Sequence, residues 1–195
     1  MASLFDTLQA NAFRAGVKAR TRQSRKWFQN NVKNLQVSRQ GLLKDTALQQ
    51  TGNTIRGNMY MYFYDPKFKE TLPYYDRFPL TIMIDPAPGG FYGLNLHYLN
   101  YPVRARFLDE LMSLAPNNVK DTTRLVKLRY DLLQSVRKYK EFKPCFKHYL
   151  GKHVVSQFSR VPMTDWEIAI FLPVEQFKKK SKASIWNESL KIARS

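Results

Sequence analysis

Cysteine is almost absent from this sequence, and long apolar runs are absent altogether. Cys145 is the only cysteine, which excludes an intramolecular disulfide and favours a reducing compartment. No apolar run approaches the roughly 18 to 20 residues that a membrane-spanning helix needs. The first residues also lack the charged and apolar regions of a signal peptide. We therefore expect a protein made in a cytoplasm, used there or packaged into something larger, and without contact to a membrane.

Acidic residues are scarce. The chain has 15 Asp and Glu against 32 Lys and Arg, a net charge of +17. An excess of this size destabilises a compact fold through self-repulsion, so a polyanionic partner is the natural explanation. The alternative is a basic protein whose charge only keeps it soluble. Apolar residues form 44% of the chain and aromatic residues 14%, so a packed core is expected rather than general disorder.

The excess charge lies in the flanks of the chain. Residues 1–50 carry nine basic and two acidic side chains, whereas residues 51–100 carry four of each. Aromatics, prolines and glycines concentrate in that neutral centre. We therefore predict a basic N-terminal helical arm at residues 1–50, a β-barrel domain at residues 51–173 with a helical insertion at 102–150, and a basic C-terminal helix at residues 174–195.

Runs of β-prone residues alternate with turn residues through the centre. Strands are predicted at residues 59–64, 80–84, 91–99, 153–158 and 166–172. Helices with an apolar stripe are predicted at residues 13–35, from Pro102 onward, at 121–139 and after Pro173. The first of these stripes begins at Phe13, and Gly16 weakens its pattern. The predicted fold class is α+β, with a small, partly open β-barrel of about five strands, an inserted helical pair, and basic N- and C-terminal helices.

Two residue clusters resemble metal or catalytic sites, and neither is complete. Cys145, His148 and His153 offer three potential zinc ligands, but a structural zinc site needs four. Asp165 and Glu167, predicted to project from one face of a strand, resemble the paired acids of a nuclease, but the further carboxylates of a two-metal site are not recognisable. No phosphate-binding loop or serine-hydrolase motif is present. We therefore predict no metal, no cofactor and no catalytic residue, with a nuclease as an alternative.

Basic side chains on the predicted helices are typical of contacts to phosphates rather than to base edges. No zinc-finger, helix-turn-helix or ribonucleoprotein motif is evident, so recognition of a particular DNA sequence is not expected. The candidate nucleic-acid-binding residues are Arg14, Lys18, Arg20, Arg22, Arg25, Lys26, Arg124, Lys127, Arg137, Lys138, Lys178, Lys179, Lys180 and Lys182.

Aromatic side chains in the neutral centre have two interpretations. Exposed rings beside basic residues can stack on unpaired bases, whereas alternating aromatics in strands usually form a core or a protein interface. Because the centre is neutral, we favour the second interpretation. Tyr74, Tyr75 and Phe78 lie in a loop between Pro73 and Pro79, and we predict that they pack across the barrel or contact another protein.

Three stretches of the centre resemble a family of tailed-phage proteins. They are Gly57–Lys67, Leu72–Leu80 and Gly90–Leu99, and the likeness continues through Lys152–Val154 and Trp166–Pro173. The family is that of the DNA end protector, or head-completion, proteins of T-even-like myoviruses and their cyanophage relatives. The resemblance covers about two thirds of the chain and brings no catalytic residues with it.

The resemblance implies a virion protein without enzymatic activity. Such a protein enters the filled head near the portal, holds the end of the double-stranded genome without sequence preference and shields it from host exonuclease. The implied partners are the DNA end and portal, neck or head proteins, and the implied location is the virion, with the host cytoplasm during assembly. A purely structural neck or baseplate component is the first alternative, and a DNA-end nuclease is the second.

Overall fold

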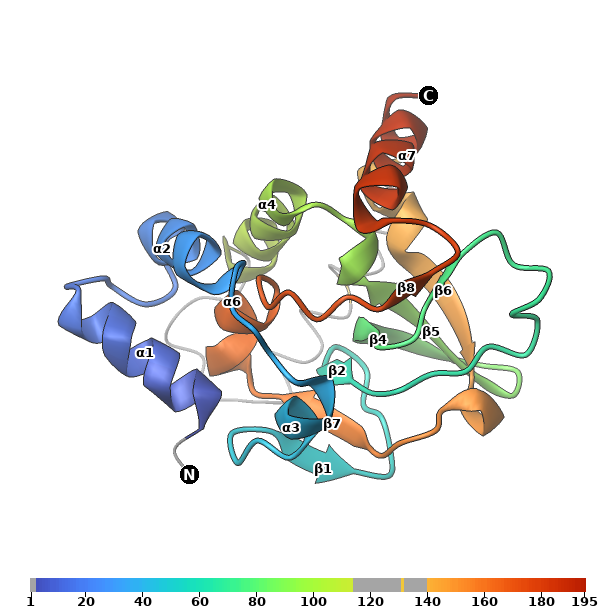
Figure 1. Ribbon diagram of the computed structural model, residues 1–195, viewed down its shortest axis with the longest axis horizontal. Coiled ribbons are helices and arrows are strands. Elements are labelled where there is room, and N and C mark those ends of the chain that lie inside the picture. Colours follow the sequence, from blue (N-terminus) through green and yellow to red (C-terminus); the bar gives the residue numbers. More distant parts are fainter. Residues whose placement is uncertain (1–2, 114–130, 132–139) are drawn as a thin grey trace.

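Helices and an antiparallel sheet make up the fold, in agreement with the predicted α+β class (Figure 1). The computed structural model describes residues 3–113, 131 and 140–195. The main sheet has six strands in the order β1-β7-β2-β4-β5-β6, each antiparallel to its neighbours. In that order they are Gln49–Thr51, Phe158–Val161, Met59–Met61, Leu80–Ala87, Gly90–Asn95 and Phe146–Leu150. Strands β3 (Tyr75–Asp76) and β8 (Phe177–Lys178) form a separate pair.

The main sheet is open at both edges. β1 and β6 are its outer strands, and among the described residues no strand pairing joins them. The predicted partly open barrel is therefore not confirmed. Strands β4 and β5 lie where strands were predicted. They are joined by a tight turn at Pro88 and Gly89, where Gly89 has a φ of 72° that favours glycine.

Hydrophobic side chains cover both faces of the sheet. Consecutive residues of a strand point to opposite faces, so a strand that is apolar at every position contributes to both. Met59 and Met61 of β2 enter the main core, which helices on that face complete. Tyr60 and Tyr62 point to the opposite face and join a second, aromatic cluster. Within it the rings of Tyr62 and Phe91 meet edge to face with centroids 6.1 Å apart. The interpretation of the central aromatics as core residues is confirmed for these side chains.

Helices gather beside the sheet, with α7 standing at the C-terminal end of the chain (Figure 1). The α-helices are α1 (Leu4–Arg14), α2 (Arg22–Val32), α3 (Arg39–Leu43), α4 (Tyr101–Ser113), α6 (Trp166–Ala169) and α7 (Lys182–Arg194). Short 3-10 turns are η1 (Leu96–Tyr98), η2 (Lys140–Cys145), η3 (Gly151–His153) and η4 (Met163–Asp165).

The N-terminal region forms two helices instead of the single helix predicted at residues 13–35. α1 ends at Arg14, and Gly16 then adopts a φ of 70°, a conformation that commonly ends a helix. α2 begins after Thr21, whose side chain and that of Ser24 cap each other's backbone N–H groups. Side chains from both helices are buried in the main core: Phe5, Leu8, Ala12, Phe28 and Val32.

Two strand predictions are wrong. Residues Trp166–Ala169 form helix α6, and every side chain from position 166 to 172 is buried. A short run that is apolar at nearly every position has no periodicity to separate a buried strand from a buried helix. Of residues 153–158, only Phe158 belongs to a strand, because β7 begins there.

The C-terminal helix begins later than predicted. Residues after Pro173 continue as an extended segment that contains β8, and α7 starts only at Lys182, after the capping residue Ser181. α4 confirms the helix predicted from Pro102. Most of the helix predicted at residues 121–139 lies outside the described residues. Within the part of the chain that is described, no helix is long and apolar enough to cross a membrane.

Candidate nucleic-acid interface

The connection between α1 and α2 is held in one shape by backbone hydrogen bonds. We call residues 14–22 the basic turn. The Val17 N–H donates to the Ala12 carbonyl at 3.0 Å and closes the end of α1. Arg20 has a φ of 60°, in the left-handed region that residues other than glycine rarely adopt. Its N–H donates to Glu167 Oε1 of α6 at 3.1 Å, so a second element fixes the turn.

Glu167 is the anchor of the basic turn, and it is buried. Its Oε2 accepts a hydrogen bond from the Ser24 hydroxyl at 2.7 Å and lies 3.7 Å from the Arg25 guanidinium. The negative charge of this carboxylate is therefore compensated inside the protein. Glu167 therefore does not neutralise the positive side chains at the surface of the basic turn.

Basic side chains leave the basic turn toward solvent: Arg14, Lys18, Arg20 and Arg22 are all exposed. Lys26, one helical turn further along α2, is exposed as well. Arg22 lies 4.0 Å from Asp109, and its side chain is 91% exposed, so this contact is weak. Among residues 3–113 and 140–195, no carboxylate forms an ion pair with the other four exposed cations, which are Arg14, Lys18, Arg20 and Lys26. Exposed cations without a carboxylate partner are suited to binding phosphate.

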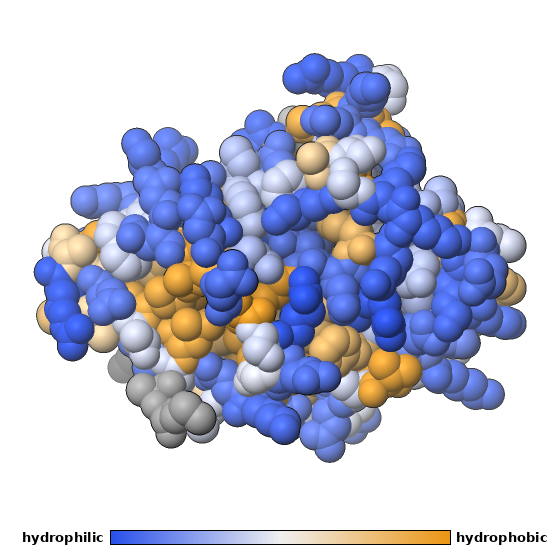
Figure 2. All heavy atoms as spheres, viewed as in Figure 1, coloured by the Kyte–Doolittle hydropathy of each residue, from blue (hydrophilic) through white to orange (hydrophobic). Residues whose placement is uncertain are grey.

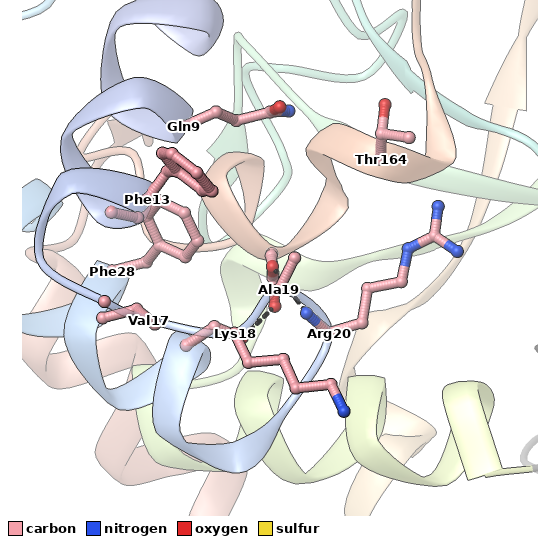
Figure 3. Close-up of a pocket in the computed structure, with 12 residues that line it drawn as sticks. Gln9, Phe13, Val17, Lys18, Ala19, Arg20, Phe28 and Thr164 are labelled. Carbon is pink, nitrogen blue, oxygen red and sulfur yellow. Dashed lines mark hydrogen bonds between the residues drawn. The ribbon is translucent and has the colours of Figure 1, made fainter.

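A groove lies beside the basic turn, between α1, α2 and the segment that contains α6 (Figure 3). Its volume is about 660 Å³. In Figure 3 the apolar side chains of Phe13, Val17 and Phe28 lie on one side, and those of Lys18 and Arg20 extend from the other. The space-filling view shows an apolar area on this face of the molecule, bordered by hydrophilic residues (Figure 2).

Arg25 does not belong to this surface, although its place in the sequence predicted a phosphate contact. Its side chain is only 7% exposed and forms ion pairs with Asp109 and Glu167. Side chains point outward all around a helix, so closely spaced basic residues cannot all face solvent when one side of the helix is packed. Arg25 lies on the buried face of α2 together with Phe28. A guanidinium enclosed in this way cannot reach a DNA phosphate, so we correct this assignment.

The C-terminal lysines are mostly engaged in local contacts. Lys180 and Lys182 each have a carboxylate partner, at 2.9 and 3.3 Å. The ammonium of Lys179 donates to two backbone carbonyl oxygens, at 2.7 and 2.9 Å. Lys178 is exposed on β8. Of the candidate residues, the structure thus brings together the N-terminal group at one exposed turn, whereas the C-terminal group helps to hold its own segment.

Four further candidates lie outside the described residues: Arg124, Lys127, Arg137 and Lys138. Their contribution to DNA binding stays a prediction.

The predicted interface loop is packed onto the protein. Phe78 is fully buried in the main core, and Tyr74 packs against that core with its ring centroid 5.9 Å from that of Tyr98. Asp76 fixes the loop by accepting hydrogen bonds from the backbone N–H groups of Phe78 and of residue 176, at 3.0 and 3.1 Å. The sequence predicted that this loop either packs within its own domain or contacts another protein, and Phe78 packs within the domain. A buried Phe78 cannot anchor a partner, so its assignment to a protein interface is wrong.

Neither alternative site is assembled by the described residues. The Cys145 thiol is buried and donates to the Phe142 carbonyl, and burial raises its pKa to about 12. His148 and His153 bind different backbone carbonyls, and the described residues contain no group of three or more potential metal ligands. Asp165 and Glu167 lie at the start of α6 rather than on a strand. They contact different partners: Asp165 accepts from the Gln9 side chain, and Glu167 accepts from the Arg20 N–H.

A buried ion pair of α4 could not be predicted from the sequence. Arg104 on α4 is fully buried, and its guanidinium contacts Glu175 Oε1 at 2.6 Å and three backbone carbonyls. Burial raises the pKa of Glu175, but the charge and hydrogen bond of Arg104, together with His97 and Lys182 nearby, outweigh burial and lower the pKa to about 2. The two residues are 71 positions apart, so no local sequence signal joins them.

Comparison with known proteins identifies a family that covers nearly the whole chain. A model of the family described as phage T4 terminal DNA protecting protein matches residues 2–191, nearly the whole chain. Neither a curated protein nor a solved structure matches the chain significantly. The family match confirms the resemblance that the three central stretches indicated.

Proposed function

Because this chain belongs to the phage T4 terminal DNA protecting protein family, we propose that it binds the ends of phage DNA and shields them from exonucleases without cleaving DNA itself. The basic turn supplies the main phosphate contacts. The observation that carries this assignment is the set of exposed cations at this turn that have no carboxylate partner among the described residues.

Phosphate contacts of this kind explain binding without sequence preference. Lysine and arginine release counterions from any DNA when they neutralise its phosphates, whatever the base sequence. Glu167 fixes the backbone of the basic turn, so little backbone conformational entropy is lost when its cations bind DNA. Lys178 and the four candidates outside the described residues are proposed as further phosphate contacts.

We extend the proposal to a position at the portal or neck of the filled head, where the packaged DNA presents its end, and to a role in head completion. This extension rests on the family resemblance. A purely structural neck or baseplate component would need no affinity for DNA, and a nuclease would degrade it, so an assay on linear DNA separates all three functions.

The test is the lifetime of linear duplex DNA in the presence of an exonuclease. We expect the wild-type protein to prolong that lifetime and to leave the DNA intact when incubated with Mg²⁺ alone. Charge reversal of the four exposed cations without a carboxylate partner at the basic turn and just after it, by substituting Arg14, Lys18, Arg20 and Lys26 with Glu, should abolish protection, because these side chains supply the phosphate contacts.

A matched control carries the same change in net charge at exposed residues elsewhere: Lys44, Lys143, Lys152 and Lys191, each substituted with Glu. Circular dichroism must show both variants folded. Equal loss of protection in the two variants would contradict the basic turn as the binding site. Cleavage of DNA by the wild-type protein would identify a nuclease, and absence of any DNA binding would favour the structural component.

A further inference from the structure

The groove beside the basic turn combines two features that phosphate binding alone does not need. It is a hollow of about 660 Å³, a size typical of sites for small organic ligands, and much of its lining is apolar. The phosphates of an internal duplex are contacted from outside the helix and require no apolar hollow. The groove therefore indicates a ligand with an uncharged, flat part as well as phosphates.

Phe13 is the most exposed large hydrophobic residue of the described chain, at 81%. It lies in the last turn of α1, and it lines the groove together with Val17 and Phe28. Leaving an aromatic ring in water is unfavourable, so a ring in this position is typical of a binding surface. The sequence places Phe13 at the start of an apolar stripe, and the structure leaves its ring exposed.

The charge around the groove is positive where it meets solvent. Lys18 and Arg20 extend from the side opposite Phe13 (Figure 3), and Arg14 lies next to Phe13 in the chain. Glu167 is the acidic residue of the lining, and Arg25 compensates its charge. A ligand with a flat apolar face and flanking phosphates would complement both the lining and the border of this groove.

We infer that the groove binds the terminal base of a DNA end, with Phe13 stacking on the base and Arg14, Lys18 and Arg20 holding the adjacent phosphates. Only an end, where the last base pair frays and has no neighbour on one side, offers an exposed base face; within a duplex both faces are covered. Stacking between bases and aromatic rings is tolerant of sequence, which suits a protein that must hold any end. The inference rests on the proposed function and deepens it, because it gives the reason why ends are preferred over internal duplex.

The experiment compares two competitors for a labelled short blunt duplex: the same duplex unlabelled, and a covalently closed DNA minicircle, which has no ends. The wild-type protein should prefer the open duplex. Phe13→Ala should weaken binding of the open duplex roughly tenfold, the range expected when one base no longer stacks on a ring, and leave binding of the minicircle unchanged. Phe13→Trp should restore the preference. Phe68→Ala is the matched control, since Phe68 is also exposed, at 60%, and lies outside the groove.

The outcomes separate the inference from the function on which it rests. If the wild-type protein binds neither competitor, the proposed function fails. If it binds both and Phe13→Ala weakens both equally or neither, phosphate binding stands and the terminal-base site is refuted. If Phe13→Ala keeps full DNA affinity and instead reduces incorporation into particles, the groove is a protein docking surface, which also overturns the inference.

Discussion

The two buried arginines of the described residues, Arg25 and Arg104, bind carboxylates or backbone carbonyls of this chain. Arg25 joins α2 to Asp109 on α4 and to Glu167 on α6, and Arg104 joins α4 to Glu175. Each pair links elements that are far apart in the chain, so each helps to fix how the helices sit on the sheet. These cations count in the net charge of the sequence but not in the charge that DNA meets.

The first prediction concerns Arg25. Substitution with Met should lower the free energy of unfolding by about 3 kcal/mol, because Glu167 would remain buried without its counter-charge. Urea unfolding measures this change. Lys26→Met, at the exposed neighbouring position, should alter stability by less than about 0.5 kcal/mol and weaken DNA binding. A stable Arg25→Met protein with reduced DNA affinity would show that Arg25 contacts phosphate after all.

At the scale of the elements, the pairing of β5 with β6 depends on a close approach of two backbones. Gly90 pairs with Leu150, and a Cβ atom at position 90 would collide with the carbonyl oxygen of Tyr149. The backbone of β6 cannot retreat without breaking the strand pairing. β6 directly follows η2, so this contact helps to hold η2 beside the sheet.

Gly90→Ala should therefore destabilise the protein by about 2 kcal/mol or more, the range of substitutions that force a clash in packed structure. Gly52→Ala is the control, because no atom lies within 4 Å of a Cβ built there and its φ is not positive. The control should be neutral or slightly stabilising. Thermal unfolding of both variants gives the comparison. A Gly90→Ala protein as stable as the control would mean that β5 and β6 are not paired in this register.

Elements with strongly β-prone residues or flanking turn residues could be predicted from the sequence, whereas an apolar run without a period could not. The β-prone run from Met59 predicted β2, although the strand ends at Met61, and the turn residues after Ala87 predicted the hairpin of β4 and β5. Trp166–Ala169 failed because its helix is buried on every side. At the candidate site, composition identified the cations, but only the packed structure separates exposed Lys26 from buried Arg25.

At the scale of the whole molecule, the cations that are exposed and not paired with a carboxylate are distributed more unevenly than the sequence indicates. Among the described residues the C-terminal lysines mostly have partners, and Arg25 and Arg104 are buried. The basic turn has exposed cations, and within the described part of the chain their one carboxylate contact is the weak one between Arg22 and Asp109. Long-range attraction of DNA depends on the total charge, whereas the bound position depends on the cations that can reach phosphates. Long-range attraction and the phosphate contacts of the bound state therefore respond differently to salt and to substitution.

The last prediction uses that difference. If phosphate neutralisation drives binding, affinity for duplex DNA should fall by orders of magnitude between about 50 and 200 mM salt, with little dependence on base sequence. The slope of log affinity against log salt measures how many phosphates are neutralised, so removing one cation that binds a phosphate should reduce it by about one. Replacing Lys18 and Arg20 with Met should lower this slope, whereas Lys180→Met should hardly change it, because Lys180 already pairs with Glu188. Fluorescence anisotropy titrations at several salt concentrations measure the slopes. Affinity that stays constant over this range would refute the electrostatic mechanism, and equal slopes for the variants would refute the basic turn as its source.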